Sequence, residues 1–343
     1  MRVLIVGGTG LISTGITRRL LERGDDVTLY NRGVHDASFA PGVQVILGDR
    51  QQFAAFEAQI AGLGYFDAVI DMVCFLPEEM ESAIRAFRGR TGQYIFCSTV
   101  DVYTRPASRY PIVESESRHP LPSYPYAYAK AQCEELVFAA HARGELNATI
   151  IRPGHTIGEG RAHIIHSMGA STHLLDRIRK SLPIICHGDG SSFWGTAHRD
   201  DVSGAFVGAL GNPQAYGKGY HAASDEMLTW DRYYQGIAEG MGWPAPKLVH
   251  IPTELLIRVA PQSALWTSQN FCYNNVFDNT AAKADLGYRF TIPWVESSRR
   301  IIQWLIAHDQ IEDTAKYPVY DAIIAAWERH GAAMADELAG LDQ

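Results

Sequence analysis

The chain has 343 residues, of which 46% are apolar and 20% are charged, and its formal net charge is −8. This composition excludes wholesale disorder, allows one large domain or two modest ones, and disfavours a general nucleic-acid binder, which would carry a basic face. The five cysteines lie far apart without a C-x-x-C pair, so we expect a reducing cytoplasm, no disulfide scaffold and no zinc site. Apolar runs fall short of the roughly 18 residues of a spanning helix, so we expect no membrane segment.

A glycine-rich turn stands at the start of the chain. The apolar run 3–6 leads into Gly7-Gly-Thr-Gly10, and a helical pattern follows, with Ser13 at the third position of the glycine motif. Glycines let the backbone approach phosphates closely, while the helix N-terminus offers free N–H groups. The spacing predicts a pyrophosphate-binding turn, although an ordinary strand-to-helix turn is the alternative for this segment alone. The residues that we expect to contact a dinucleotide here are Gly7, Gly10, Leu11 and Ile12.

Strand and helix signals alternate through the first half of the chain. Short, nearly all-apolar strands that alternate with helices predict a parallel sheet covered on both faces, a doubly wound Rossmann-type α/β fold. The second half is richer in Pro, His and Trp, and predicts a smaller, discontinuous lobe for the substrate. We expect a dinucleotide-binding domain at 1–154, to which about 198–224 returns, and a substrate lobe at 155–197 and 225–343. The predicted strands are 3–6, 27–30, 43–47, 68–70, 94–97, 148–151 and 219–222, and the predicted helices include 51–61, 77–87 and 124–142.

Tyr126 and Lys130 are four residues apart in a predicted helix, and therefore share one helix face. A cationic ammonium beside a phenol lowers the pKa of the phenol toward working pH. Such a phenol can donate or accept the proton that accompanies hydride transfer at an alcohol or ketone. The pair predicts an acid/base at Tyr126 that Lys130 tunes, with a surface pair as the alternative.

Thr99 follows the predicted strand 94–97, at the edge where a parallel sheet presents its functional groups. A hydroxyl there can hydrogen-bond both a substrate oxygen and Tyr126. The alternative is a Ser/Thr pair that caps the end of the strand. We expect Thr99 to orient the substrate oxygen.

Taken together, these segments resemble the extended short-chain dehydrogenase/reductase family, the NAD-dependent epimerases and dehydratases, in an atypical branch. The resemblance covers nearly the full length and implies a Rossmann-type domain with a nicotinamide cofactor and with Thr99, Tyr126 and Lys130 in the catalytic roles. Beyond the glycine turn, it implies cofactor contacts at Asn31, Arg32, Asp49, Arg50, Met72, Lys130, Pro153 and His155. The segments that carry it are 7–10, 48–50, 98–99, 126–130, 152–154, 188–190, 198–202 and 284–288.

Cofactor choice depends on the end of the second strand, Tyr30-Asn-Arg-Gly33. Asn31 stands where an acidic residue would bind the ribose 2′-OH of NAD, and Arg32 follows it. Because an arginine can pair with a 2′-phosphate, the sequence slightly favours NADP over NAD. A solvated arginine in a turn is the alternative.

Two departures from the family concern the substrate. Phe193-Trp194-Gly195 replaces the arginine with which many members bind a sugar nucleotide's diphosphate, which favours a smaller or less anionic substrate. Val100 and Asp101 replace the Asp-Glu pair of dehydratases, which disfavours a full dehydratase mechanism. The residues that we expect at the substrate are Asp101, His155, Trp194 and Arg199.

We therefore predict an NAD(P)-dependent oxidoreductase or epimerase that acts by hydride transfer on a secondary alcohol or ketone of a sugar or sugar derivative. We also expect a homodimer. The atypical branch includes chloroplast stem-loop RNA-binding proteins, so an RNA-associated or regulatory protein is one alternative, and a nucleotide-sugar dehydratase is another. We predict no metal site, although imidazoles crowd one region without a fixed carboxylate pattern. That region contains His155, Glu159, His163, His166, His173 and His187.

Overall fold

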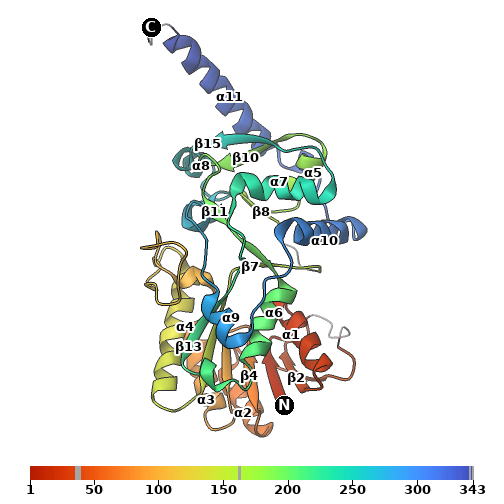
Figure 1. Cartoon of the computed structure of the whole chain (residues 1–343), viewed down its shortest axis with the longest axis vertical. Coiled ribbons are helices and arrows are strands. Elements are labelled where there is room, and N and C mark those ends of the chain that lie inside the picture. Colours follow the sequence, from red (N-terminus) through yellow and green to blue (C-terminus); the bar gives the residue numbers. More distant parts are fainter. Residues whose placement is uncertain (35–39, 161–163, 340, 342–343) are drawn as a thin grey trace. The chain divides into compact units, whose positions relative to one another are not determined.

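The computed structural model describes residues 1–34, 40–160, 164–339 and 341, and the chain forms two compact units (Figure 1). Unit 1 consists of 1–158, 195–226 and 276–293. Unit 2 consists of 159–194, 227–275 and 294–343. Each unit is therefore assembled from three separate stretches of the chain.

Unit 1 is built on a seven-stranded parallel sheet in the order β13-β6-β5-β4-β1-β2-β3. This arrangement confirms the predicted doubly wound Rossmann-type fold. The strands are β1 (Arg2–Val6), β2 (Asp26–Asn31), β3 (Gln44–Leu47), β4 (Ala68–Asp71), β5 (Tyr94–Cys97), β6 (Ala148–Pro153) and β13 (Lys218–Ala222). The helices are α1 (Leu11–Glu22), α2 (Phe53–Gly62), α3 (Pro77–Phe87), α4 (Pro125–Ala142), α6 (Arg199–Ala209) and α9 (Thr280–Leu286), and β7 (His155–Ile157) pairs with β12 (Thr196–His198).

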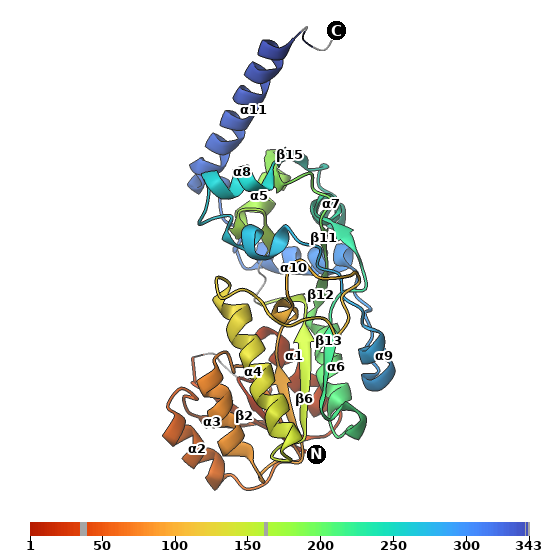
Figure 2. The same ribbon diagram turned by 90° about the vertical axis from the view of Figure 1, so that its left-hand side faces the viewer.

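Each face of the sheet is covered by its own set of helices (Figure 2). Successive strand residues point to opposite faces, so Val3 and Ile5 of β1 enter one core while Leu4 and Val6 enter the other. The first core is closed by α1, α6 and α9, and the second by α2, α3 and α4. A strand that is buried on both faces has to be apolar at every position, which is the pattern of these short segments.

Residues 276–293 correct one expectation about the division of the chain. The sequence analysis assigned them to the smaller lobe, but they belong to unit 1. The reason is α9, whose Ala282 and Leu286 are buried in the core beside α6. The pairing of β7 with β12 also keeps residues 155–158 and 195–197 in unit 1.

Unit 2 is smaller and contains short sheets and long helices. Cys186 and His250 are register partners in its parallel pair β10–β15. The last helix, α11, is 21 residues long, and only Tyr320 and Ile324 of it are buried. The elements of this unit are β8 (Ile165–His166), β9 (Gly169–Ala170), α5 (His173–Arg179), β10 (Pro183–His187), β11 (Phe193–Trp194), β14 (Leu228–Thr229), α7 (Trp230–Met241), β15 (Lys247–Ile251), α8 (Thr253–Val259), a π-helix (Thr267–Phe271), α10 (Trp294–Ala307) and α11 (Pro318–Leu338). Every helix in the described part of the chain is too short or too polar to cross a bilayer.

Candidate active site

The glycine turn between β1 and α1 has the backbone that a phosphate site requires. Gly7 has a φ of +86°, and a Cβ there would collide with Val73. The Gly10 N–H donates to Ser13 Oγ at 2.7 Å, so the serine in the third motif position caps the start of α1. Among the described residues, a Cβ on Gly10 would meet Ser13 Oγ, at 3.2 Å, and the Gly7 carbonyl, at 4.0 Å. These residues otherwise leave space in front of Gly10, as a pyrophosphate would need.

The substitution Gly10→Val is expected to weaken cofactor affinity at least tenfold, or about 1.4 kcal/mol. Gly10 has a φ of −81°, which valine can adopt, so the branched side chain should enter the phosphate space without unfolding the turn. Titration of NADP and NAD by intrinsic fluorescence measures the affinity, and circular dichroism checks the fold. Equal affinities in wild type and variant would contradict the assignment of the cofactor's pyrophosphate to this turn.

Asn31 lies at the carboxyl end of β2, beside the glycine turn. Its Oδ1 accepts the Gly8 N–H at 2.8 Å, while its Nδ2 is buried and has no hydrogen-bond partner among the described residues. Arg32 follows it and is exposed. The buried Asn31 Nδ2 is a donor, and the exposed Arg32 guanidinium next to it is a cation. Together they fit the 2′-phosphate of NADP better than the 2′-hydroxyl of NAD. The residues present therefore fit a dinucleotide cofactor.

Arg50 is buried within unit 1 and does not occupy the position that was expected for a cofactor contact. Its side chain is only 5% exposed, and Nη1 donates to both carboxylate oxygens of Asp71 at 2.7 and 2.8 Å. Its Nη2 donates to the Glu79 carbonyl at 2.6 Å. Arg50 therefore anchors α3 to the end of β4 and has no exposed donor for a cofactor. Asp49 and Met72, the expected neighbours of the cofactor, remain half-buried near this edge.

Thr99 and Tyr126 meet at the carboxyl end of β5. Thr99 Oγ1 accepts the Asp101 N–H at 3.2 Å. Tyr126 exposes 42% of its surface, so solvent or a ligand can reach it. Loss of hydration around the hydroxyl, followed by the negative charge of Asp101, raises the pKa of Tyr126, while the nearby Thr99 hydroxyl acts to lower it. The two predicted catalytic hydroxyls are thus brought together.

Lys130 is buried, and its ammonium occupies a position that corrects one sequence expectation. Nζ donates to the Cys97 carbonyl at 2.7 Å and to the Cys74 carbonyl at 2.8 Å. It also lies over the rings of Phe75 and Phe96. The expected lowering of the Tyr126 pKa by Lys130 is absent here, because the ammonium binds the end of β5 and the loop that follows β4 instead. Its present effect is to fix the backbone just before Thr99.

Tyr124 is a residue of this site that the sequence analysis did not single out. Its hydroxyl donates to Asp101 Oδ2 at 2.8 Å, and its ring lies 6.4 Å from the Tyr126 ring. Burial, together with Asp101, raises the pKa of Tyr124, so the phenol stays a donor. The tyrosine repeat at 124, 126 and 128 was the available signal. Ser98 is a second omission, since its buried Oγ has no hydrogen-bond partner in the described part of the chain.

Pro153, His155 and Arg199 lie on elements that extend from the same edge of the sheet. Pro153 ends β6, and His155 Nδ1 lies 3.3 Å from Thr196 Oγ1 across the β7–β12 pair. Arg199, 8% exposed, packs its side chain against Gly158. His155 is half-buried, which leaves part of its surface accessible. Their contacts with a cofactor or substrate stay predictions.

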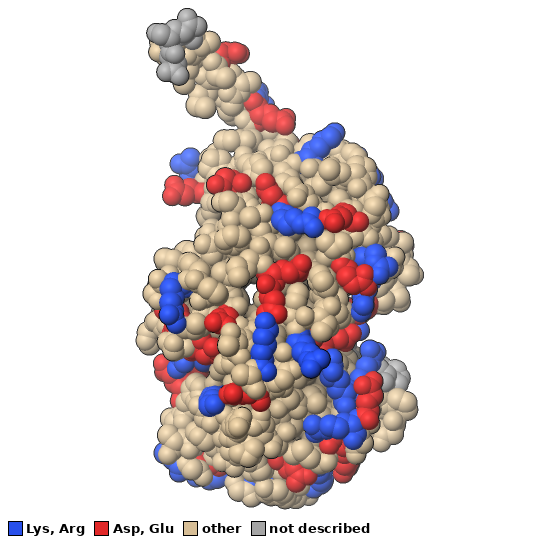
Figure 3. Space-filling model, viewed as in Figure 1, with Lys and Arg blue, Asp and Glu red and all other residues tan. Residues whose placement is uncertain are grey.

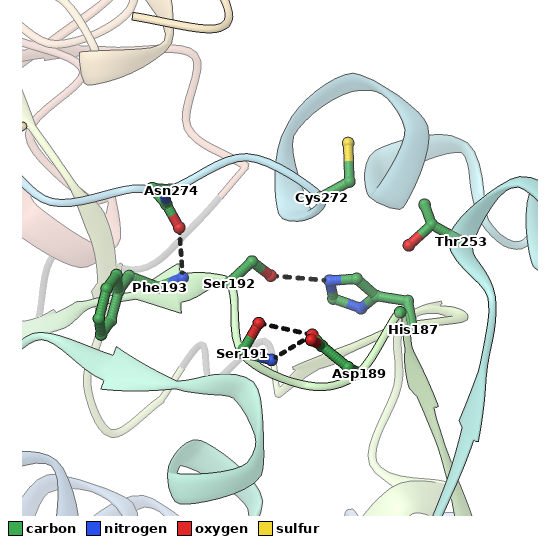
Figure 4. A pocket seen from close by; sticks show the side chains of 9 residues that line it. His187, Asp189, Ser191, Ser192, Phe193, Thr253, Cys272 and Asn274 are labelled. Atoms are coloured by element: carbon green, nitrogen blue, oxygen red, sulfur yellow. Dashed lines mark hydrogen bonds between the residues drawn. The ribbon is translucent and has the colours of Figure 1, made fainter. Parts of the chain in front are cut away.

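Trp194 belongs to unit 2 and is placed inside it, which corrects the expectation of a substrate contact. Its ring is 5.3 Å from the Trp230 ring and 5.0 Å from the Phe271 ring, and the residue is 4% exposed. The neighbouring Phe193 instead lines a pocket of about 320 Å³ (Figure 4). That pocket is bordered by the polar turn 188–192 and contains Thr253, Cys272 and Asn274.

The crowded histidines of unit 2 serve its packing. His166 Nε2 and His173 Nδ1 both bond Ser171 Oγ, at 2.7 and 2.6 Å. Burial lowers the pKa of His166 to about 3 and that of His173 to about 4. These rings are therefore neutral at pH 7 and hydrogen-bonded within the unit. His163 lies outside the described residues.

Comparison with known proteins gives consistent matches. The model of the NAD dependent epimerase/dehydratase family matches residues 3–222. Over 278 residues the chain is 28% identical to a 2'-dehydrokanamycin reductase of Streptomyces kanamyceticus, which covers 81% of this chain and 77% of that protein. Over 266 residues it is 26% identical to the chloroplast stem-loop binding protein of 41 kDa b of Arabidopsis thaliana, with 73% and 65% covered. The UDP-glucuronic acid 4-epimerase of Bacillus cereus in complex with NAD superposes with a TM-score of 0.69 at 15% identity, over 90% of this chain and 99% of that one.

Proposed function

Because the chain belongs to the NAD-dependent epimerase/dehydratase family, and is an NAD-dependent enzyme of the extended short-chain type, we propose that it reduces a ketone or oxidises a secondary alcohol of a sugar or sugar derivative. The observation that carries this proposal is the position of the Tyr126 phenol beside Thr99 and Asp101 at the carboxyl end of β5. Tyr126 is exposed there, on the same edge of the sheet as the glycine turn. A reductase of a dehydro-sugar antibiotic among the relatives supports a sugar-like substrate.

The chemistry that a nicotinamide supplies when bound is the gain or loss of a hydride. Tyr126 transfers the proton at the substrate oxygen, because its raised pKa keeps the phenol protonated and ready to donate. Thr99 donates to the same region and fixes the substrate oxygen. Lys130 holds the strand end that carries Thr99 and, with a cofactor present, binds its ribose.

The experiment that tests this proposal has two parts. The cofactor retained by the purified protein is identified by mass spectrometry, and ketone and alcohol forms of sugars and aminosugars are screened at the absorbance of reduced nicotinamide. Turnover with exchangeable cofactor supports a reductase, whereas tightly retained NAD with isomer interconversion supports an epimerase. Absence of both cofactor binding and turnover would overturn the proposal.

Cofactor choice is proposed to favour NADP. The double substitution Asn31→Asp/Arg32→Ala is expected to move the NADP-to-NAD affinity ratio at least tenfold toward NAD, because it exchanges a donor for an acceptor and removes the guanidinium. Fluorescence titration of both cofactors measures the ratio. Arg18→Ala, on the exposed side of α1, is the matched control for loss of a surface charge. A wild type that prefers NAD, or an unchanged ratio, would contradict the proposal.

An RNA-associated role is the second candidate, because a stem-loop binding protein is among the relatives. In the face shown in Figure 3, basic and acidic side chains are interspersed on each unit, rather than gathered in one basic stripe. Such a surface gives a phosphate backbone little net attraction. Gel-shift titration with an RNA stem-loop at two salt concentrations distinguishes the two roles, and we expect weak, salt-labile binding.

A homodimer and a cytoplasmic location are the remaining parts of the proposal. All five cysteines are free thiols, which suits a reducing compartment. Leu121 and Tyr128, at 67% and 39% exposure, give the region around the start of α4 an apolar surface that a second copy could cover. Sedimentation equilibrium would show two chains per particle, and a monomer would contradict the dimer.

A further inference from the structure

Three side chains that bind metals well meet in unit 2, whereas the residues of the proposed active site belong to unit 1. Cys186 of β10 and His250 of β15 are register partners on adjacent parallel strands, so their side chains share one face of the pair. Asp231, in the first turn of α7, faces them. His250 Nε2 lies 2.8 Å and Cys186 Sγ lies 3.6 Å from the same oxygen, Asp231 Oδ1.

The distances of the thiol and of the imidazole from Asp231 Oδ1 are close to those between ligands of a tetrahedral zinc centre. All three ligand atoms lie within 4.8 Å of one another. With Zn–S near 2.3 Å and Zn–N or Zn–O near 2.0–2.2 Å, tetrahedral geometry puts ligand atoms about 3.3–3.7 Å apart. The sulfur-to-oxygen distance already fits, and the imidazole has to move by only about half an ångström from the carboxylate. His250 and Asp231 have side chains that are 38% and 34% exposed, so the cluster is open to solvent for entry and for a fourth ligand.

The turn Gly188-Asp189-Gly190 closes one side of this cluster. A Cβ on Gly190 would collide with Asp231 Oδ1 and would lie 2.9 Å from His250 Nε2, so only glycine fits against the pair. Asp189, on the same turn, is hydrogen-bonded to Ser191 Oγ (Figure 4). Its carboxylate also interacts electrostatically with His250. Two carboxylates therefore surround one imidazole and one thiol, which is an electrostatic setting for a divalent cation.

We propose that Cys186, Asp231 and His250 bind a zinc ion, with the fourth position open to water. A thiolate, an imidazole and a carboxylate form a ligand set that selects zinc over magnesium or calcium. Bound there, the ion would join β10, β15 and α7, and would stabilise unit 2. No sequence motif marks this site, since its ligands are separated by 45 and 19 residues along the chain.

The test uses the full chain, stripped with a chelator and titrated with Zn²⁺ and, separately, with Co²⁺. We expect one equivalent to bind, with a cobalt spectrum that contains a thiolate charge-transfer band and the intense visible bands of tetrahedral coordination. His250→Gln is expected to weaken zinc affinity at least tenfold, and Cys186→Ala to remove the charge-transfer band. Cys272→Ala and His308→Gln, which change a half-buried thiol and a surface imidazole of the same unit, are the matched controls and should leave both signals intact.

Stability gives a second readout. All seven tryptophans of the chain lie in unit 2, so their fluorescence follows the unfolding of that unit. Zinc is expected to raise the urea midpoint of this transition in wild type and not in His250→Gln, whose half-exposed site should tolerate the change. Saturable zinc binding that Cys186→Ala and His250→Gln leave unchanged, or no binding above the controls, would overturn the proposal.

Discussion

Replacing Tyr126 with Phe is expected to lower turnover by about 10²–10⁴-fold while leaving cofactor affinity nearly unchanged, because the ring stays and only the proposed proton carrier is lost. Tyr126 is 42% exposed and no hydrogen bond of its hydroxyl holds the fold of the described residues together, so removal of the hydroxyl should cause little structural damage. The measurement is single-turnover absorbance of reduced nicotinamide with the best substrate from the screen.

Two further variants sharpen this test. Tyr128→Phe changes a tyrosine of similar exposure, 39%, two residues along α4, and should keep wild-type turnover. Lys130→Met should reduce both turnover and cofactor affinity, since it removes the bonds to the Cys97 and Cys74 carbonyls as well as the proposed ribose contact. Near-wild-type turnover in Tyr126→Phe would refute the hydride-transfer assignment and direct attention to His155 and Asp101.

The second large effect concerns stability. Arg50→Met is expected to lower the free energy of unfolding of unit 1 by about 3–5 kcal/mol, because it leaves the Asp71 carboxylate buried without its cation. Asp71 is 0% exposed, and its remaining donors include the Tyr94 hydroxyl at 2.8 Å and the Val73 N–H. Urea unfolding followed by far-ultraviolet circular dichroism measures the loss.

The double variant Arg50→Met/Asp71→Asn separates charge burial from simple loss of packing. A neutral amide can still accept from Tyr94, so we expect it to recover a substantial part of the lost stability. The tryptophan signal, which comes from unit 2, serves as the internal control. An Arg50→Met variant with wild-type stability would mean that the buried pair contributes nothing.

The sheet of unit 1 could be predicted closely from the sequence because its strands are buried on both faces and leave an uninterrupted apolar signal. The expected strand 94–97 and helix 77–87 match β5 and α3, and the other elements differ by one or two residues at their ends. The glycine turn was also recognisable from the sequence, because few residues other than glycine adopt the positive φ of Gly7. Local rules were sufficient where local geometry decides the structure.

The site was predictable only in part, because side-chain partners depend on contacts between distant segments. Arg50 follows Gly48-Asp49, a position at which the sequence predicts a cofactor contact. In the structure its side chain instead binds the Asp71 carboxylate, 21 residues away on β4. Lys130 shares a helix face with Tyr126, but its ammonium instead binds the carbonyls of Cys97 in β5 and Cys74 in the loop after β4. Trp194 directly follows Phe193, which lines the pocket of unit 2. Because successive side chains of a strand point to opposite sides, the Trp194 ring lies in the aromatic core instead.

The interleaving of the two units along the chain has a consequence for how the protein is made. The core of unit 1 is completed by α9, which is synthesised only after 159–194 and 227–275 of unit 2. The Rossmann sheet therefore cannot close its α6 face before most of the other unit has been synthesised. Contacts of such long sequence separation slow folding, and the part of α6 that packs against α9 stays uncovered meanwhile. Expression of this chain should accordingly depend strongly on chaperones that shield apolar helices during synthesis.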